Sequence, residues 1–140
     1  MKTFYTALMT YFNAMTGSAH NAFYIDVAGQ LYHTEAEQGA TFPYCVLSHV
    51  LSVPEDTFTE KLDEILIQFS IFSKKDSSVE VMDAMADLKT LFDDCSFTIT
   101  GDTLVYFVRG IEGLTREEMD SDEGQSVWHY HVDYRVLVQR

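Results

Sequence analysis

Two histidines and an aspartate near the C-terminus have a spacing that suits metal binding. His129, His131 and Asp133 are each separated by one residue, so in a β-strand their three side chains lie on the same face. Imidazole and carboxylate groups are ligands of zinc and iron. One hypothesis is therefore a metal-dependent hydrolase that uses these three residues.

The same run is similar to the His-X-His-X-Asp motif of metallo-β-lactamase-type hydrolases. In that family the motif continues with histidine, whereas Tyr134 follows here. Domains of that family are longer than this chain, and further ligands would have to come from His20, His33 or His49, which form no recognisable pattern. The sequence has no glycine-rich phosphate loop, nucleophile elbow or identifiable Cys–His pair. We therefore expect neither an enzyme nor a cofactor.

The element that holds these residues is predicted to be a long strand over residues 125–139. From Trp128 to Val138 every second residue is apolar or aromatic, and the residues between them are mostly polar, which is typical of a half-buried strand. At about 3.3 Å per residue such a strand is roughly 40 Å long. We interpret it as the spine of an antiparallel sheet, with an overhang that a second copy covers. Asp133 and Arg135 would then pair with neighbouring strands, and we favour this over the metal site.

Apolar residues spaced by three or four predict two amphipathic helices, over residues 3–16 and 77–92. Gly17 is in the usual place to end the first helix. Ser77 and Glu80 have the spacing of a capping box at the start of the second.

The other predicted elements are strands, hairpins and loops. They are a short strand or hairpin over 23–32, an exposed loop over 33–42, a strand over 43–51 with both faces partly covered, a strand over 62–73, a hairpin of 97–100 with 103–109, and an acidic loop over 111–124. Helices set apart from runs of strands indicate an α+β fold. We expect a mainly antiparallel sheet with two helices packed on one face, in a single domain over residues 1–140.

Charge is the unusual property of the composition. The chain has 22 acidic and 9 basic residues, a net charge of −13. This excludes binding to nucleic acid by neutralising phosphates, which needs Lys and Arg. It suits a passage through which DNA slides, or a basic partner.

Cys45 and Cys95 are predicted to be buried, reduced thiols, with a single bridge as the alternative. No apolar run reaches the length of a membrane span and no signal-peptide pattern begins the chain, so we expect a protein made in the cytoplasm.

Four segments taken together resemble the tail completion, or tail terminator, proteins of long-tailed double-stranded DNA phages, related prophages and gene transfer agents. The resemblance runs from Leu31 to the C-terminus. The segments are Leu31-Tyr32 with the loop into Thr41-Phe42-Pro43-Tyr44, the strand Ile67-Gln68-Phe69-Ser70-Ile71-Phe72, the helix start at Ser78 and Glu80, and Val127-Trp128-His129 with Asp133-Tyr134-Arg135-Val136.

The resemblance implies a structural virion component of the tail or neck, assembled in the host cytoplasm. Such proteins form a hexameric ring that caps the tail tube and stops polymerisation of the tube protein. The ring presents a surface to the head connector, where a head-completion or stopper protein is expected, and DNA passes through its lumen without specific binding. No metal, cofactor or membrane is implied.

Contact residues are expected in the two long loops and on the polar face of the terminal strand. Long loops on a rigid sheet commonly carry binding function. Alternatives to a terminator are another neck or head-closure ring protein, the metal-dependent hydrolase described above, and an acidic DNA mimic that occupies a basic host protein. The residues expected to make contacts are His33, Glu35, Glu37 and Gln38, then Glu112, Glu117, Glu118, Asp120, Asp122 and Glu123, and finally His129, His131, Asp133 and Arg135.

Overall fold

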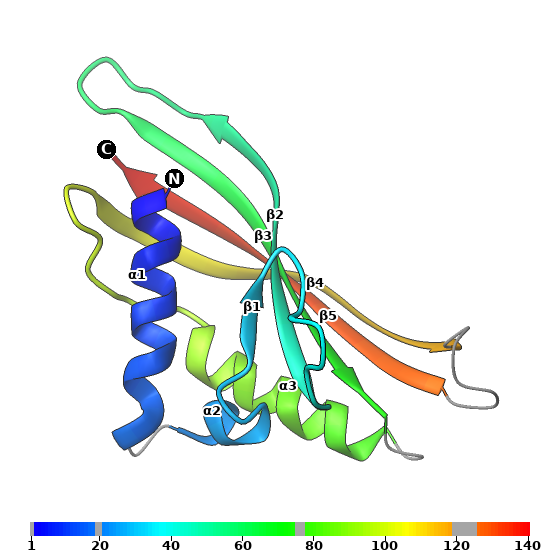
Figure 1. Ribbon diagram of the computed structural model, residues 1–140. Helices are drawn as coiled ribbons and strands as arrows, with labels where there is room; N and C mark the ends of the chain where they lie inside the picture. Colours follow the sequence, from blue (N-terminus) through cyan, green and yellow to red (C-terminus); the bar gives the residue numbers. More distant parts are fainter. Residues whose placement is uncertain (1, 19–20, 75–77, 119–125) are drawn as a thin grey trace.

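The structure, a computed structural model, describes residues 2–18, 21–74, 78–118 and 126–140. A five-stranded sheet carries three α-helices on one face (Figure 1). The elements in chain order are α1 (Lys2–Asn13), the 3-10 turn η1 (Ala14–Gly17), α2 (Ala22–Asp26), β1 (Leu31–His33), β2 (Tyr44–Pro54), β3 (Leu62–Ser73), α3 (Val79–Phe92), β4 (Thr103–Glu118) and β5 (Ser126–Gln139).

The sheet has the order β1-β2-β3-β5-β4, in which β1 is parallel to β2 and every other pair is antiparallel. β5 is paired on both sides, with β3 from Leu62 to Ser73 and with β4 from Thr103 to Glu118. The predicted mainly antiparallel sheet with the terminal strand as its spine is confirmed. The predicted overhang is wrong from Trp128 to Gln139, where the strand's own chain supplies both neighbours.

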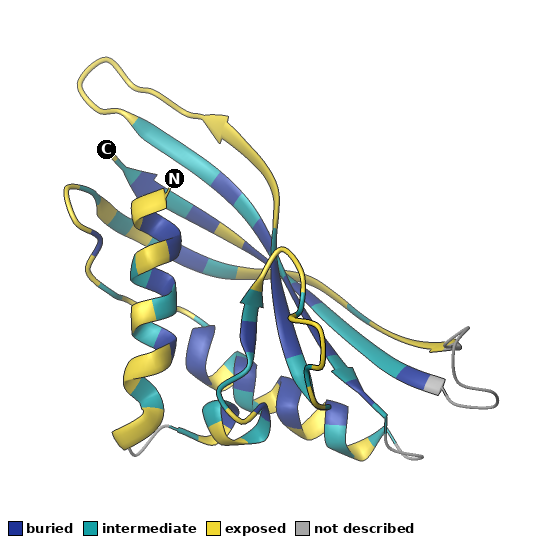
Figure 2. Ribbon diagram, in the orientation of Figure 1, coloured by how far each residue is buried: buried dark blue, intermediate teal, exposed yellow. Residues whose placement is uncertain are grey.

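The hydrophobic core lies between the helices and one face of the sheet. Phe69 of β3 stacks on Phe92 of α3 with ring centroids 4.6 Å apart, and Phe12 of α1 meets Phe23 of α2 at 5.7 Å. Alternate residues of β5, Val132 and Tyr134 among them, are fully buried on this face (Figure 2). The residues between them are on the other face, which we call the open face.

Residues 22–26 form a helix where a short strand or hairpin over 23–32 was predicted, so the α-helices number three among the described residues rather than two. In a strand Phe23, Ile25 and Val27 would share one face. In the structure Phe23 of the helix and Val27, the residue that follows it, reach the core, whereas Ile25 points away and is 63% exposed. Because Phe23 and Val27 are buried and Ile25 is not, this segment is helical rather than extended.

Two predictions about the segment after α3 are also wrong. Residues 97–100 form no strand, only an isolated bridge between Ile99 and Asp102. The acidic segment from 111 is not a loop but continues β4 as far as Glu118. The physical reason is the length of β5, whose second edge needs a partner for its backbone groups up to Ser126. The predicted N-cap Ser77 lies outside the described residues.

Candidate functional site

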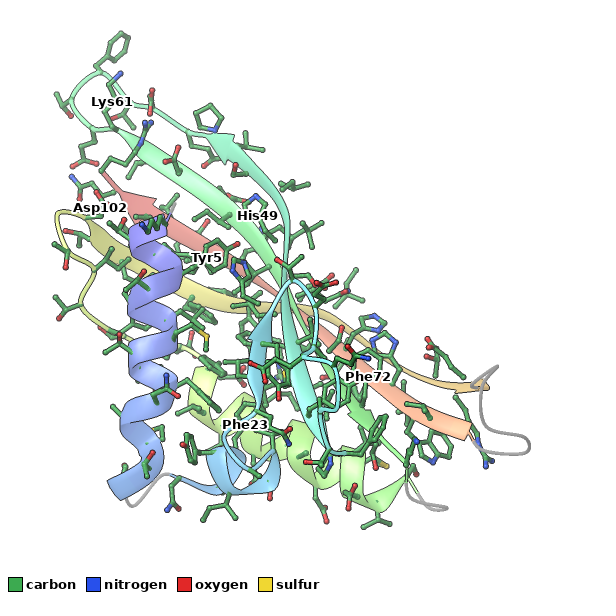
Figure 3. The ribbon with its side chains drawn as sticks, viewed as in Figure 1. Tyr5, Phe23, His49, Lys61, Phe72 and Asp102 are labelled. Carbon is green, nitrogen blue, oxygen red and sulfur yellow. The ribbon has the colours of Figure 1, made fainter. Side chains whose placement is uncertain are left out.

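The row of His129, His131 and Asp133 lies on the open face of β5, as the alternation predicts. The side chains do not converge. His129 Nδ1 is 3.1 Å from Glu117 Oε1, and its ring stacks on Phe72 at 4.5 Å (Figure 3 labels Phe72). Asp133 Oδ1 accepts a hydrogen bond of 3.0 Å from Gln68 Nε2.

The geometry favours a polar strand surface over a metal centre. The pairing of Asp133 with Gln68 across to β3 confirms the expected contact between strands. The ring of His131 lies against Gly113, where an added Cβ would come within 2.8 Å of its Cε1. Within the described parts of the chain, no three His, Cys, Asp or Glu side chains are grouped to hold a metal.

The loop after β1 is exposed at its tip and fastened at its base. The Thr41 backbone N–H donates to Gln30 Oε1 at 3.2 Å, and Gln30 Nε2 donates back to the Thr41 carbonyl at 2.9 Å. His33 stacks on Tyr5 of α1 at 4.3 Å. The other predicted contact residues of this loop, Glu35, Glu37 and Gln38, are exposed.

The predicted acidic contact residues are divided between a strand and a segment outside the described residues. Glu112 Oε2 is 3.1 Å from Lys89 Nζ of α3, and Glu117 pairs with His129. These carboxylates therefore help to hold β4 in place. Glu118 is the last residue of β4. Arg135 is exposed on β5. Asp120, Asp122 and Glu123 lie outside the described residues.

The free margin of β2 is a candidate interaction surface that the sequence analysis missed. β1 covers β2 only at 45–47, and among the described residues the backbone bonds on this margin end with Thr34 N–H donating to the Leu47 carbonyl at 2.8 Å. Beyond that point Val50, Leu51 and Val53 are 50%, 46% and 47% exposed. The prediction that both faces of this strand are partly covered holds only for its first half.

This free part of β2 begins where α1 is anchored and runs outward into the hairpin with β3. The Tyr5 hydroxyl and His49 Nδ1 share a hydrogen bond of 2.6 Å and point toward each other in Figure 3. Burial raises the pKa of Tyr5 to about 12. The hairpin tip extends away from the helices, and its Phe58 is fully exposed (Figures 1 and 2). The uncharged run Val50-Leu51-Ser52-Val53 has three apolar residues and lies beyond the reach of the three-residue strand β1, and this was the signal available in the sequence.

The outer margin of β4 is covered in its first half and open in its second. Asp94 N–H donates to the Phe107 carbonyl at 3.1 Å, and Arg109 Nε is 3.7 Å from Asp93 Oδ1. From residue 110 to residue 117 the strand is mostly exposed, with Ile111 at 75% and Leu114 at 37%. As far as the described residues show, the sheet therefore ends in one open stretch on each side.

A pair of carboxyl groups lies between α2 and α3. Burial raises the pKa of Asp26 to about 7, and a hydrogen bond to Asp87 and the charges of Asp87, Asp83 and Glu80 act in the same direction. Asp26 Oδ2 is buried without a hydrogen-bond partner. The contact between α2 and α3 therefore depends on pH.

Both cysteines are free thiols; Cys45 is fully buried and Cys95 partly buried.

The fold and these surfaces are those of a protein suited to contact with other macromolecules. A helix-covered sheet with two open margins, and a hairpin that exposes Val50, Leu51, Val53 and Phe58, offers surfaces for assembly. None of the described helices is long and apolar enough to cross a membrane.

Comparison with known proteins gives the family. Residues 18–139 match the family model described as tail completion protein gp17, and the chain belongs to this family. It is a structural component of a phage tail and therefore of the virion. No curated protein sequence matches the chain.

Two solved structures share the fold. A chain of the virion of a native gene transfer agent particle aligns with a TM-score of 0.66 at 10% identity, covering 96% of both chains. Another solved chain aligns with a TM-score of 0.52 at 10% identity, covering 96% of this chain and 94% of its own. At this identity the likeness concerns the fold alone.

Proposed function

We propose that the protein is a tail terminator. In this proposal six copies form a ring that caps the tail tube, stops addition of the major tail tube protein and presents the opposite surface to the head-completion or stopper protein of the connector. The match of residues 18–139 to a tail completion family carries the proposal.

The charge and the exposed surfaces agree with this role. A ring of subunits that each carry −13 would repel the phosphate backbone and let DNA pass without binding. The exposed residues Glu35, Glu37 and Gln38 at the tip of a fastened loop suit contacts with an axial partner, since the loop is held while its tip stays accessible. The polar residues of β5 on the open face, Asp133 and Arg135 included, would face the lumen or a neighbour.

A tube-capping assay tests the proposal. The major tail tube protein of the same phage is polymerised with and without this protein, and tube lengths are measured in negative-stain images. We expect shorter tubes with extra density at one end, because a bound ring removes the surface on which the next tube ring would assemble. Tubes of unchanged length and unchanged ends would overturn the proposal.

The same mixture separates the terminator from another neck protein. A head-closure ring would bind the connector and leave free tube ends unoccupied. Binding is therefore measured in parallel with connector rings alone. Capture by connectors without any effect on tubes would assign the protein to head closure, and the terminator role would be wrong.

A further inference from the structure

The two open margins of the sheet are suited to pair with each other between copies of the protein. We define the β2 free edge as residues 48–54 and the β4 free edge as residues 110–118. Each has a register shift near its start, between His49 and Leu51 on β2 and between Arg109 and Glu112 on β4. Beyond these shifts the pairing inside the chain is regular. Each free edge therefore offers a straight row of backbone donors and acceptors.

The β2 free edge is free of charge in a chain that is otherwise strongly acidic. Residues 38–54 contain no Asp, Glu, Lys or Arg, although the net charge is −13. Its apolar side chains lie on both faces of the strand, a pattern typical of a central, covered strand, yet they are about half exposed here. Copies of such an acidic chain repel each other, so an uncharged edge is the surface on which a second copy can approach most closely.

Strand directions allow the two edges to join between copies in the same orientation. β2, β3, β5 and β4 alternate in direction, so β4 runs opposite to β2. A rotation about a ring axis preserves these directions in the next copy. Its β2 would then lie antiparallel beside β4 of the first copy, and the antiparallel pattern would continue unbroken from copy to copy.

The two free edges lie at opposite corners of the sheet, which sets the stagger of such a joint. Leu51, the middle of the β2 free edge, pairs with Leu66, which in turn pairs with Arg135 of β5. Leu114, the middle of the β4 free edge, pairs with Tyr130 of β5, five residues away from Arg135. Joining the edges shifts each copy by about five residues, roughly 17 Å at 3.3 Å per residue. Four strands span roughly 19 Å. The strands would tilt by about 40°, within the range of closed barrels.

We propose that the β2 free edge of one copy pairs with the β4 free edge of the next copy, so that the sheets of all copies form one closed, tilted barrel. The proposal rests on the ring of the proposed function and names the surfaces that build it. Unlike edges join, so the contact is heterologous and leads to a ring rather than a dimer. Both complementary edges belong to this chain, which makes a second copy the occupant.

Lysine substitutions on each edge test the pairing. One variant carries Val50→Lys with Val53→Lys, and a second carries Ile111→Lys with Leu114→Lys. Lysine blocks edge pairing, and it lowers the net negative charge, so a loss of assembly cannot come from added repulsion. The control is Ile25→Lys, an apolar position on α2 whose exposure of 63% lies within the range of the four edge positions. Masses are measured by light scattering and native mass spectrometry, and folding by circular dichroism.

We expect a ring for the wild-type protein and the control, a folded monomer for each blocked variant alone, and a heterodimer when the two variants are mixed. The heterodimer follows because each variant retains the edge that the other lacks. Dimers of either variant alone would mean that like edges pair, and rings of either variant would mean that other surfaces assemble the protein. Both results overturn the edge pairing and leave the ring intact. A wild-type protein that stays monomeric, alone and with tube protein, overturns the ring as well.

Hydrogen exchange of the wild-type protein gives an independent measurement. Backbone amides in 48–54 and 110–118 that point away from the sheet should exchange at least roughly tenfold more slowly in the assembled protein than in the diluted monomer, because pairing protects them. Equal exchange in both states would refute the pairing even if the lysine variants failed to fold.

Discussion

Replacing Asp26 by asparagine tests whether the carboxyl pair between α2 and α3 destabilises the protein near neutral pH. Asp26 is hydrogen-bonded to Asp87 and faces the charges of Asp83 and Glu80 on α3, and its Oδ2 is buried without a partner. Asparagine has nearly the same shape, has no charge at any pH and keeps a donor for the Asp87 carboxylate. The substitution therefore imitates the protonated form.

The magnitude follows from the pKa of Asp26, which rises from 3.8 to about 7 on folding. A shift of this size corresponds to roughly 4 kcal/mol at 1.4 kcal/mol per pKa unit. Asp26 is only partly buried, and solvent screening reduces the effect to about 1–2 kcal/mol. The folded state holds the proton more tightly, so the stabilisation is complete below the unfolded pKa and is lost as pH rises toward about 7.

Urea unfolding at several pH values measures this effect. Stability of the wild-type protein should fall by about 1–2 kcal/mol between roughly pH 4 and pH 8 through this pair, whereas Asp26→Asn should lose that decline and be the more stable protein at the upper end. Protein concentration is held constant, because assembly adds to apparent stability. The control is Glu37→Gln, which removes one charge from an exposed loop. An Asp26→Asn protein with the wild-type pH slope would refute the reasoning.

Three further outcomes are expected. Tyr134→Phe should cost about 1.5–3 kcal/mol in urea unfolding, because the fully buried hydroxyl donates to Asp93 at 2.7 Å; an unchanged midpoint would contradict this. Gly113→Ala should cost about 1 kcal/mol and shift the His131 ring resonances in NMR spectra, since the new Cβ meets that ring at 2.8 Å; unmoved resonances would mean the contact is absent. Raising salt from about 20 to about 500 mM should strengthen self-association of the −13 chain, and weaker association in sedimentation would contradict it.

Periodicity was sufficient to predict the centre of the fold. The alternation from Trp128 to Val138 places the polar residues of β5 on one face and its core residues on the other, and the structure has them so. The first helix follows from Phe4, Leu8 and Phe12, all buried. These predictions are correct because burying one face of a strand or a helix requires apolar residues at the period of that element.

Contacts between distant parts of the chain determine the elements that the sequence periodicity did not predict. The glycine and three glutamates of residues 111–118 led to the prediction of a loop, and these residues form a strand because β5 needs a second neighbour. Residues 23–27 fit a strand or a helix by hydrophobicity, and only packing of Phe23 against Phe12 and Phe92 selects the helix. The open half of β2 depends on the length of β1, which covers only three of its residues.

The position of β5 in the sheet bears on how the protein assembles. From Trp128 to Gln139 it is paired with both β3 and β4 of its own chain, so separating two copies at the sheet margins breaks no bond of this part of the strand. The strands left exposed by separation, at 48–54 and 110–118, each keep one partner inside the chain. The monomer should therefore fold before it assembles, and blocking either edge should give a stable single subunit. An assembly built by exchanging β5 between copies would instead couple dissociation to unfolding of the sheet, and the closed pairing of this strand argues against it.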